Sequence, residues 1–448
     1  MKRAGNAPAA NYVWSAVAGA PSNPTCFAYN SVTDTLFVGT KANSVWRCDL
    51  ATGATPVWTD LARFSPMPQN LQYLGNVVTI TKLVLDGSNL IVATDRDYVW
   101  ECSGADGIVT SASWARLSTG LFSPAVNDIA YDATNKLLYA AAYDYSASPS
   151  GLWVADLNEA SPVWSDMPTP LAPGRGSLHH LAYDATRNVL YTSSSNFNTG
   201  IWRVELTGPA TWTDISSSLI GVATSSLLVD EGNNILYVGL SVGSVQHGVY
   251  RIAHPTTTPT AVNTNMVAPV SATIGYSLNA LVQDSDRNVL YCATGEQTGK
   301  AYLGTSPNAS CSWSSISQMG TNVDVKALCY GGSTLFAATN GAAGVLFSHS
   351  TPPAGSPSVP MGVSLKAKIT SMSPAKQYVG KYVTIKGTTF GSTRGSSYVK
   401  FGAVKATSYS SWSATKIVVK VPARSLVRER VVVVTSAGAS NYAAFSTY

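Results

Sequence analysis

Four segments of the sequence together supply aromatic, amide and acid side chains, a combination that suits carbohydrate binding. They contain Tyr143, Asp144 and Tyr145, then Asn196, Phe197 and Asn198, then His247, and finally Glu296. An aromatic ring stacks on the C–H face of a sugar, while amides and carboxylates bond its hydroxyl groups. The alternative is that these residues belong to ordinary surface loops, and the sequence leaves both interpretations open.

The same segments raise the question of glycoside hydrolysis, which needs two carboxyl groups about 5–9 Å apart. No motif selects a pair among the candidates, which are Asp95, Asp97, Asp128, Asp144 and Glu296. The chain has no nucleophile elbow, phosphate-binding loop or dinucleotide fingerprint. His179 and His180 are neighbours on an expected strand and point to opposite faces, so they cannot bind one metal together. We therefore name no catalytic residue and expect no metal and no cofactor.

Basic residues are concentrated at the C-terminal end of the chain. Residues 365–448 hold nine Lys and four Arg against one acid, Glu429, whereas residues 1–364 have a net charge of −7. This asymmetry predicts an attachment surface for an anionic capsid, lipopolysaccharide or acidic polysaccharide. Its candidate residues are Lys376, Lys381, Lys386, Lys400, Lys405, Lys420, Arg428 and Arg430. Two alternatives remain, a solvated basic surface and docking against the chain's own acidic part or a neighbouring copy. Nucleic acid is not favoured, because no aromatic interleaving or known reader pattern is present.

The strands that position these residues are indicated by a repeated sequence motif of the type Leu-Tyr-Thr-Ser-Ser. Its copies begin at residues 36, 90, 138, 190, 236, 290 and 335. Each repeat divides into short alternating runs separated by turn residues, which indicates four strands. A β-rich repeat of this length is typical of a β-propeller. The sequence thus predicts an all-β protein in which residues 1–350 form a seven-bladed β-propeller.

The last repeat lacks its fourth strand, because the chain enters a Pro-rich segment soon after Phe347. The matching pattern stands at the other end of the chain, around Trp14. We expect this N-terminal segment to supply the outer strand of the last blade and so to close the ring.

A polar residue enters each first strand, and a large apolar residue follows two positions later. The polar positions are Thr25, Thr81, Asn127, His179, Ser225, Asn279 and Lys326. The functional interpretation is that these residues form a polar ligand-binding cup at the mouth of the propeller's central channel. Asn127 and His179 are then ligand-binding candidates. The alternative is that any solvated channel mouth must be polar.

The connections between third and fourth strands, at residues 49–58 and 205–212, loosely resemble Asp-box (BNR) hairpins. That family of repeats occurs in sialidases, xyloglucanase-type glycoside hydrolases and sortilin-like receptors, where the boxes are structural turns. Residues 351–364 have the composition of a Pro/Gly/Ser linker. From residue 365 the chain resembles an IPT/TIG domain, on Ile369–Pro374, Val383–Gly387, Val399–Gly402 and Val431–Thr435. The resemblance implies an immunoglobulin-like β-sandwich over 365–448, of the kind that serves as a spacer or adhesive unit.

The six cysteines form no metal-binding spacing, and we expect most of them to be buried. Cys26 and Cys329, on first strands of adjoining blades, leave a ring-closing disulfide as a second option. The N-terminus is basic but no apolar segment follows, so the sequence as given shows no secretory signal. We expect a processed form, or exit by another route such as virion assembly and lysis.

These observations favour a non-enzymatic binding or structural protein, extracellular or part of a virion, such as a phage decoration, fibre or tail-associated protein. The expected partners are other structural proteins of an assembly or cell-surface glycans, with no membrane span. Two alternatives stay open, a secreted glycoside hydrolase or lyase and a bacterial surface adhesin.

Overall fold

The structure is a computed structural model that describes residues 14–448 with internal gaps. The gaps are 42–43, 51–55, 62–77, 108, 111–112, 144–150, 169–177, 195–199, 208–210, 217–218, 220–222, 241–247, 254–259, 262–277, 285–287, 295–300, 306–311, 317–323, 332–333, 341–345, 351–366, 389, 392, 396, 403, 424–427 and 436–437.

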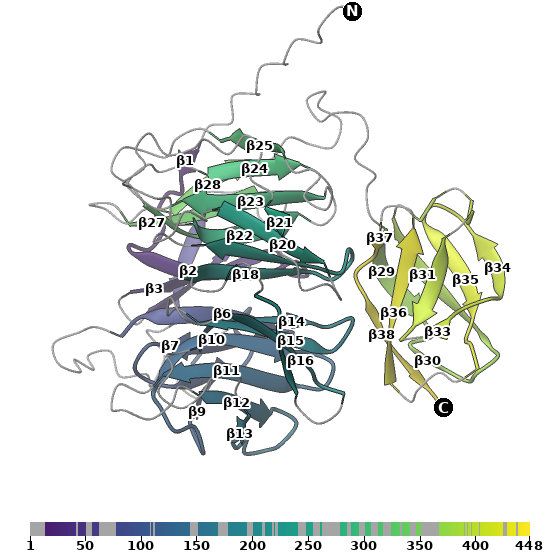
Figure 1. The fold of residues 1–448 in the computed structure, drawn as a ribbon, viewed down its shortest axis with the longest axis horizontal. Helices are drawn as coiled ribbons and strands as arrows, with labels where there is room; N and C mark the ends of the chain where they lie inside the picture. Colours follow the sequence, from purple (N-terminus) through teal and green to yellow (C-terminus); the bar gives the residue numbers. More distant parts are fainter. Residues whose placement is uncertain are drawn as a thin grey trace, which may run out of the picture.

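Residues 15–350 form four-stranded antiparallel sheets (Figure 1). The first three are β2 (Pro24–Asn30), β3 (Thr35–Thr40), β4 (Val45–Asp49) and β5 (Val57–Asp60); β6 (Ile80–Asp86), β7 (Asn89–Thr94), β8 (Val99–Cys102) and β9 (Trp114–Leu117); and β10 (Ala125–Asp132), β11 (Leu137–Tyr143), β12 (Gly151–Asp156) and β13 (Ser165–Met167). Next come β14 (Leu178–Asp184), β15 (Val189–Ser194), β16 (Ile201–Glu205) and β17 (Trp212–Asp214), then β18 (Thr224–Asp230), β19 (Ile235–Leu240), β20 (Gly248–Ala253) and β21 (Thr260–Ala261). The remaining two are β22 (Leu278–Asp284), β23 (Val289–Thr294), β24 (Ala301–Thr305) and β25 (Ser312–Ser315), and β26 (Asp324–Gly331), β27 (Thr334–Asn340), β28 (Leu346–Ser350) and β1 (Ser15–Ala16).

The first strands of these sheets contact one another in sequence order, β2, β6, β10, β14, β18, β22 and β26, and β26 in turn contacts β2. Each second strand is packed between neighbouring sheets, which is why the repeated Leu-Tyr phrase is apolar. All six residues of β3, β15, β19 and β23 are buried. This arrangement is that of a β-propeller.

The N-terminal strand β1 completes the sheet of β26, β27 and β28. Ser15 pairs with Ser348 and Ala16 with Phe347, so the predicted pairing of this segment with the strand around Phe347 is confirmed. Trp14, 7% exposed, packs in a cluster with Tyr291 and other buried residues of two sheets. The N-terminal segment therefore adds a strand and also part of the core.

The turn between first and second strands repeats one local design. In the third sheet, Asp132 accepts hydrogen bonds from the backbone N–H groups of Thr134 and Asn135. Lys136 then has a φ of 58°, which lies in the left-handed region. An Asp or Asn that bonds the backbone two or three residues ahead stabilises such turns. Positive φ recurs at the equivalent Asp34, Asn188, Asn234 and Asn288.

Residues 367–448 form a separate two-sheet sandwich. One sheet has the order β29 (Lys368–Ser373), β31 (Tyr382–Thr388), β35 (Lys416–Lys420), β34 (Tyr409–Trp412). The other has the order β30 (Lys376–Gln377), β38 (Ala443–Thr447), β36 (Arg428–Thr435), β32 (Tyr398–Phe401), β33 (Val404–Lys405), with β37 (Gly438–Ala439) paired to β36. Alternate residues of β31 and β35 point inward and pack on Phe401 and Phe445 in one core.

Five cysteines lie in the described residues, and all five are free thiols. Cys26 and Cys329 are among them, so the structure contradicts the optional ring-closing disulfide. Burial raises the pKa of Cys26 and of Cys329 to about 12, as expected for thiols in an apolar core. Among the described residues, no helix has the length and apolar character needed to cross a membrane.

Candidate functional site

Most of the predicted carbohydrate-binding residues fall outside the described residues. These are Asp144, Tyr145, Asn196, Phe197, Asn198, His247 and Glu296. Tyr143 is described at the end of β11, half-buried, where its backbone carbonyl accepts a hydrogen bond from Ser123. The loop site therefore stays a prediction, anchored at one end by Tyr143.

The seven polar residues that enter the first strands occupy one structural position, a β-bulge. In each sheet the pairing of first and second strands skips one residue, and the skipped residues are Thr25, Thr81, Asn127, His179, Ser225, Asn279 and Lys326. A bulge leaves its residue out of the ladder and turns its side chain away from the sheet's normal direction. The repeated polarity thus has a backbone cause.

Four of these bulge residues tie neighbouring sheets together. The Oγ1 atom of Thr25 donates to the carbonyl of Ile80 at 2.7 Å, and Thr81 donates to Val126 at 2.8 Å. The side-chain amides continue the pattern: Asn127 donates to Leu178 at 2.8 Å and Asn279 to Val325 at 2.8 Å. Each acceptor precedes the bulge of the next sheet. Asn127, a predicted ligand-binding residue, thus has a structural role through its amide nitrogen.

Residues at the next position along the same strands, Lys82, Asp128 and His180, form a cluster of charged and imidazole side chains with the bulge residue His179. Lys82 Nζ lies 2.9 Å from Asp128 Oδ1, and Asp128 Oδ2 accepts the backbone N–H of Leu181. The rings of His179 and His180 are 6.2 Å apart. Burial lowers the pKa of His180 to about 4, against the opposing charge of Asp128, so His180 is neutral at pH 7. Desolvation also lowers the pKa of His179.

Three of the candidate carboxylates are engaged in specific contacts. Asp128 is paired with Lys82, and Asp97 lies 2.5 Å from the Arg116 guanidinium and accepts the indole N–H of Trp100. Asp95 accepts the backbone N–H of Thr79 at 2.7 Å. Desolvation raises the pKa of Asp97, although Arg116 opposes the shift. Among the described residues, no group of three or more His, Cys, Asp or Glu could hold a metal ion.

The face formed by the turns after the first strands has a second set of contacts, which the sequence did not predict individually. At several boundaries between sheets, a nitrogen donor reaches the acid that ends a first strand. The donors are Lys136 to Asp86, Arg187 to Asp184 and to the carbonyl of Glu231, and Gln283 to Asp230.

At the boundary between the third and fourth sheets, the donor comes from the C-terminal sandwich. Arg430 donates to Asp132 Oδ1 at 2.8 Å and to Thr134 Oγ1 at 2.9 Å. Its guanidinium lies between the rings of Tyr183 and Tyr442, 5.7 and 5.0 Å from their centroids. Side-chain exposure is 11% for Arg430 and 0% for Asp132. The sandwich therefore docks on this face, beside the propeller in Figure 1.

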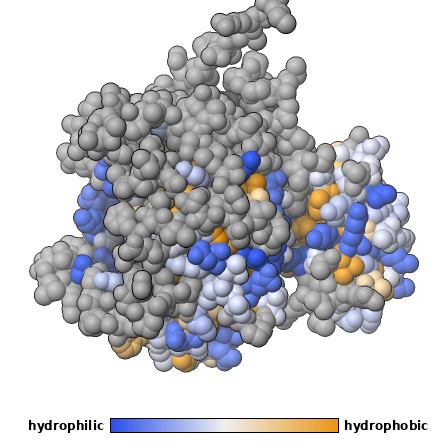
Figure 2. Space-filling view, in the orientation of Figure 1, coloured by the Kyte–Doolittle hydropathy of each residue, from blue (hydrophilic) through white to orange (hydrophobic). Residues whose placement is uncertain are grey.

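The other predicted attachment residues lie on the sandwich surface. Lys376, Lys381, Lys386, Lys405 and Lys420 are exposed and Lys400 is half-buried, whereas the side chain of Arg428 lies outside the described part. Lys386 is the cross-strand partner of Lys416, and Lys400 is the partner of Lys405. Hydrophilic residues cover much of the visible sandwich face (Figure 2). Arg430 differs from these lysines because it contacts Asp132 of the propeller. This contact matches the alternative interpretation, in which the basic domain docks against the chain's own acidic part.

The comparisons with known proteins agree with this division of the chain. A family model described as IPT/TIG domain matches residues 367–448. Residues 367–448 are an IPT/TIG domain. The predicted start of this domain at residue 365 differs from the start of the match by two positions. In a separate comparison, no curated protein matches the chain.

Solved structures show the fold of the remainder. The β-propeller domain of Myceliophteria thermophila Cps50 (Swd1) has 13% identity and a TM-score of 0.54, over 76% of this chain and 100% of that one. The WD40 repeats of RRP9 have 12% identity and a TM-score of 0.54, over 76% and 97%. A fungal alcohol oxidase of the AA5 family, in complex with copper, has 11% identity and a TM-score of 0.58, over 98% and 100%. The chain is thus an all-β protein with a propeller-like part followed by the TIG domain.

Proposed function

We propose that the protein is a non-enzymatic binding or structural component that works outside the cell or in a virion. Phage decoration, fibre or tail-associated proteins are the closest functional type. In this proposal the propeller presents its loops between second and third strands to glycans or protein partners, and the TIG domain attaches the molecule to an anionic surface.

The observation that carries the proposal is the pairing of like charges on the TIG surface. Lys386 lies directly across from Lys416 in one sheet, and Lys400 across from Lys405 in the other. Like charges at directly opposed positions destabilise a sheet. A bound anion would remove this repulsion, so these pairs favour attachment to a polyanion over a purely solvated role.

The place where the TIG domain contacts the propeller is compatible with separate roles for the two domains in this proposal. Arg430 contacts the turn that precedes β11, and the predicted loop site follows Tyr143 at the other end of this seven-residue strand. At about 3.4 Å per residue, the two ends are roughly 20 Å apart. The TIG contact and Tyr143, from which the predicted loop site starts, therefore lie at opposite ends of β11.

For the fold itself, we propose a closed seven-bladed ring whose hairpins between third and fourth strands are related to Asp-boxes. The circular order of contacts among the first strands supports the closed ring. The paired strands on either side of residues 49–57, β4 and β5, are consistent with an Asp-box hairpin.

The non-enzymatic character is supported by the contacts of Asp95, Asp97 and Asp128, which leave none of the three as a free acid or base. A glycan array probed with the full chain, combined with an assay for released sugars, tests the proposal. We expect retention of specific glycans without hydrolysis. Release of reducing sugar from a retained glycan would show that the protein is an enzyme and would refute the proposal.

A further inference from the structure

Exposed aromatic side chains gather at one end of the TIG domain. Tyr378, Val379 and Tyr382 lie in and beside the turn that joins β30 to β31, and Tyr448 follows β38. Their exposed fractions in the whole chain are 57%, 45%, 46% and 64%, so the docked propeller does not cover them. We call these four residues the tyrosine patch. An exposed apolar patch on a soluble domain marks an interaction site.

The backbone holds this patch in place. The N–H of Lys381 donates to the carbonyl of Tyr378 at 3.1 Å, and Gly380 has a φ of 82°, as the third residue of a type II turn requires. The N–H of Gly380 also donates to the carbonyl of Val421 at 2.9 Å. The rings of Tyr378 and Tyr448 stack with centroids 4.5 Å apart and an interplanar angle of 22°. The two rings thus form one platform that is ordered before a ligand arrives.

Lysine side chains border the platform. Lys376 Nζ lies 4.2 Å from the centroid of the Tyr448 ring. Lys381 belongs to the turn itself, and Lys420 is the cross-strand partner of Tyr382. All three lysines are exposed, and residues 365–448 hold nine Lys and four Arg against one acid. The patch is therefore complementary to a ligand that carries both a ring and a negative charge.

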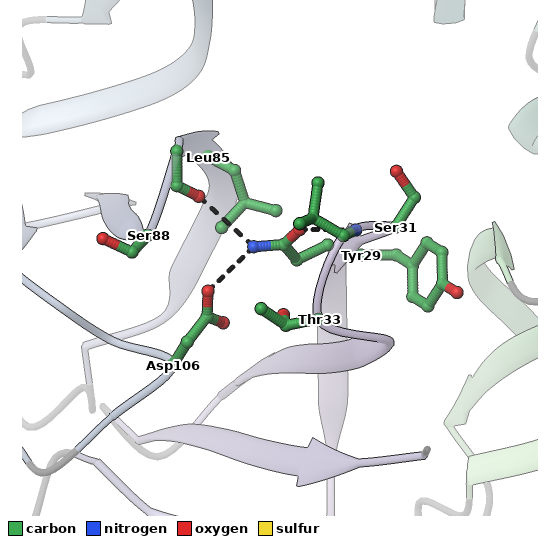
Figure 3. A pocket seen from close by; sticks show the side chains of 9 residues that line it. Tyr29, Ser31, Thr33, Leu85, Ser88 and Asp106 are labelled. Atoms are coloured by element: carbon green, nitrogen blue, oxygen red, sulfur yellow. Dashed lines mark hydrogen bonds between the residues drawn. The ribbon is translucent and has the colours of Figure 1, made fainter. Parts of the chain in front are cut away.

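The groove between the first two sheets of the propeller lacks this combination. There the amide of Asn30 donates to Asp106 Oδ2 at 2.8 Å and to the carbonyl of Gly87 at 3.3 Å (Figure 3). Among the described residues that line the groove, Asp106 is an acid and none is basic. An anionic ligand is repelled there, whereas the lysines of the TIG domain attract it.

We infer that the tyrosine patch binds an acidic polysaccharide built of uronic acids. The C–H face of a sugar ring packs on the exposed tyrosine rings, and the carboxylates accept charge-assisted hydrogen bonds from Lys376, Lys381 and Lys420. This inference rests on the proposed attachment of the TIG domain to an anionic surface and names the polymer that forms the surface.

The stacking of the two tyrosines favours a sugar over a nucleic acid. Proteins that bind single-stranded nucleic acid stack successive bases on aromatic side chains along a basic groove. Here Tyr378 and Tyr448 stack on each other and so offer one platform, which suits a single sugar ring with charges beside it.

The test compares binding of the full chain to polygalacturonate, polyacrylate and polythymidylate of matched charge. Polygalacturonate carries its carboxylates on sugar rings, whereas polyacrylate carries them on an aliphatic chain. We expect polygalacturonate to bind about tenfold more tightly than either of the others. Equal binding of the two carboxylate polymers would overturn the inference and leave the charge-based attachment intact. Tighter binding of polythymidylate would assign the patch to nucleic acid and would also overturn it.

Substitutions in the patch locate the preference. Tyr378→Ala and Tyr448→Ala should each reduce it, while Tyr378→Phe keeps the ring and should retain it. Tyr398→Ala is the matched control, because Tyr398 also has a lysine over its ring, Lys405 at 3.9 Å, but is half-buried. This control should keep the preference. A preference that survives both alanine substitutions in the patch would contradict the inference.

Lys386→Gln with Lys416→Gln separates this inference from the proposed function. These two lysines face each other across β31 and β35, so their substitution should weaken both carboxylate polymers by the same factor and leave the preference. Loss of the preference in this variant would place the sugar contact outside the tyrosine patch and overturn the inference. Failure of all three polymers to bind the original chain would refute the proposed attachment itself.

Discussion

Arg430 of the TIG domain and Asp132 of the propeller form an ion pair at 2.8 Å, although 298 positions separate them in the sequence. Asp132 is fully buried and Arg430 nearly so, which makes the pair part of an interface. Removing one partner of a buried pair costs about 3–5 kcal/mol, because the other charge is left without compensation.

The first prediction is that Arg430→Ala releases the TIG domain from the propeller. Water can reach Asp132 once the domains separate, so the cost appears as lost docking and not as unfolding of either domain. Small-angle scattering should show a larger radius of gyration, and proteolysis between the domains should become faster. Arg394→Ala, which removes an exposed arginine stacked on Tyr409, is the control and should change neither. Unchanged scattering by Arg430→Ala would show that other contacts hold the domains.

A second prediction concerns the hydrogen bonds between neighbouring sheets. Asn127→Ala removes the bond to the carbonyl of Leu178 and should lower the free energy of unfolding by about 1–2 kcal/mol. Ser225 occupies the equivalent bulge, and its Oγ has no hydrogen-bond partner, so Ser225→Ala should cost much less. Chemical denaturation of the two variants measures the difference. Equal losses would mean that the bonds from bulge residues do not stabilise the ring.

This part of the molecule shows how far the sequence can be interpreted. The regular spacing of the polar residues predicted that they share one structural position. Their polarity alone could not distinguish a ligand-binding role from hydrogen bonding between neighbouring sheets. The deciding feature is the β-bulge, which depends on the register of backbone pairing. The polar residues mark its position, but their types do not reveal that the register shifts there. Likewise, the acid at Asp132 and the basic C-terminal region were visible, whereas the pairing of Arg430 with that acid depends on how two separate domains dock.

A third prediction concerns pH and His180. Its pKa in the folded chain is about 4, lowered by burial, and an unfolded histidine titrates near 6.5. The unfolded chain therefore binds more protons between these values, so the free energy of unfolding falls as the pH drops from about 6.5 to 4, by up to roughly 3 kcal/mol. Denaturation at a series of pH values measures this slope. His180→Asn should flatten it, and a slope equal to that of the original chain would contradict the assignment.

A fourth prediction addresses the N-terminal segment. Trp14 is buried beside Tyr291 and Leu335, so Trp14→Ala should lower the free energy of unfolding by about 3–5 kcal/mol. Val57, 71% exposed on β5, is the control, and Val57→Ala should have little effect. Thermal unfolding compares the two. A small effect of Trp14→Ala would show that the ring does not depend on this segment, against the pairing of β1 with β28.

The most direct test of the account is the salt dependence of attachment to an immobilised polyanion such as dextran sulfate. If the paired lysines of the TIG domain form the attachment surface, the affinity should fall steeply from about 0.05 to about 1 M NaCl. Lys386→Gln with Lys416→Gln should weaken binding at low salt, while Lys41→Gln, an exposed lysine of the propeller, should not. Affinity that is the same at low and high salt, or unaffected by the paired substitutions, would contradict the proposed role of the TIG domain.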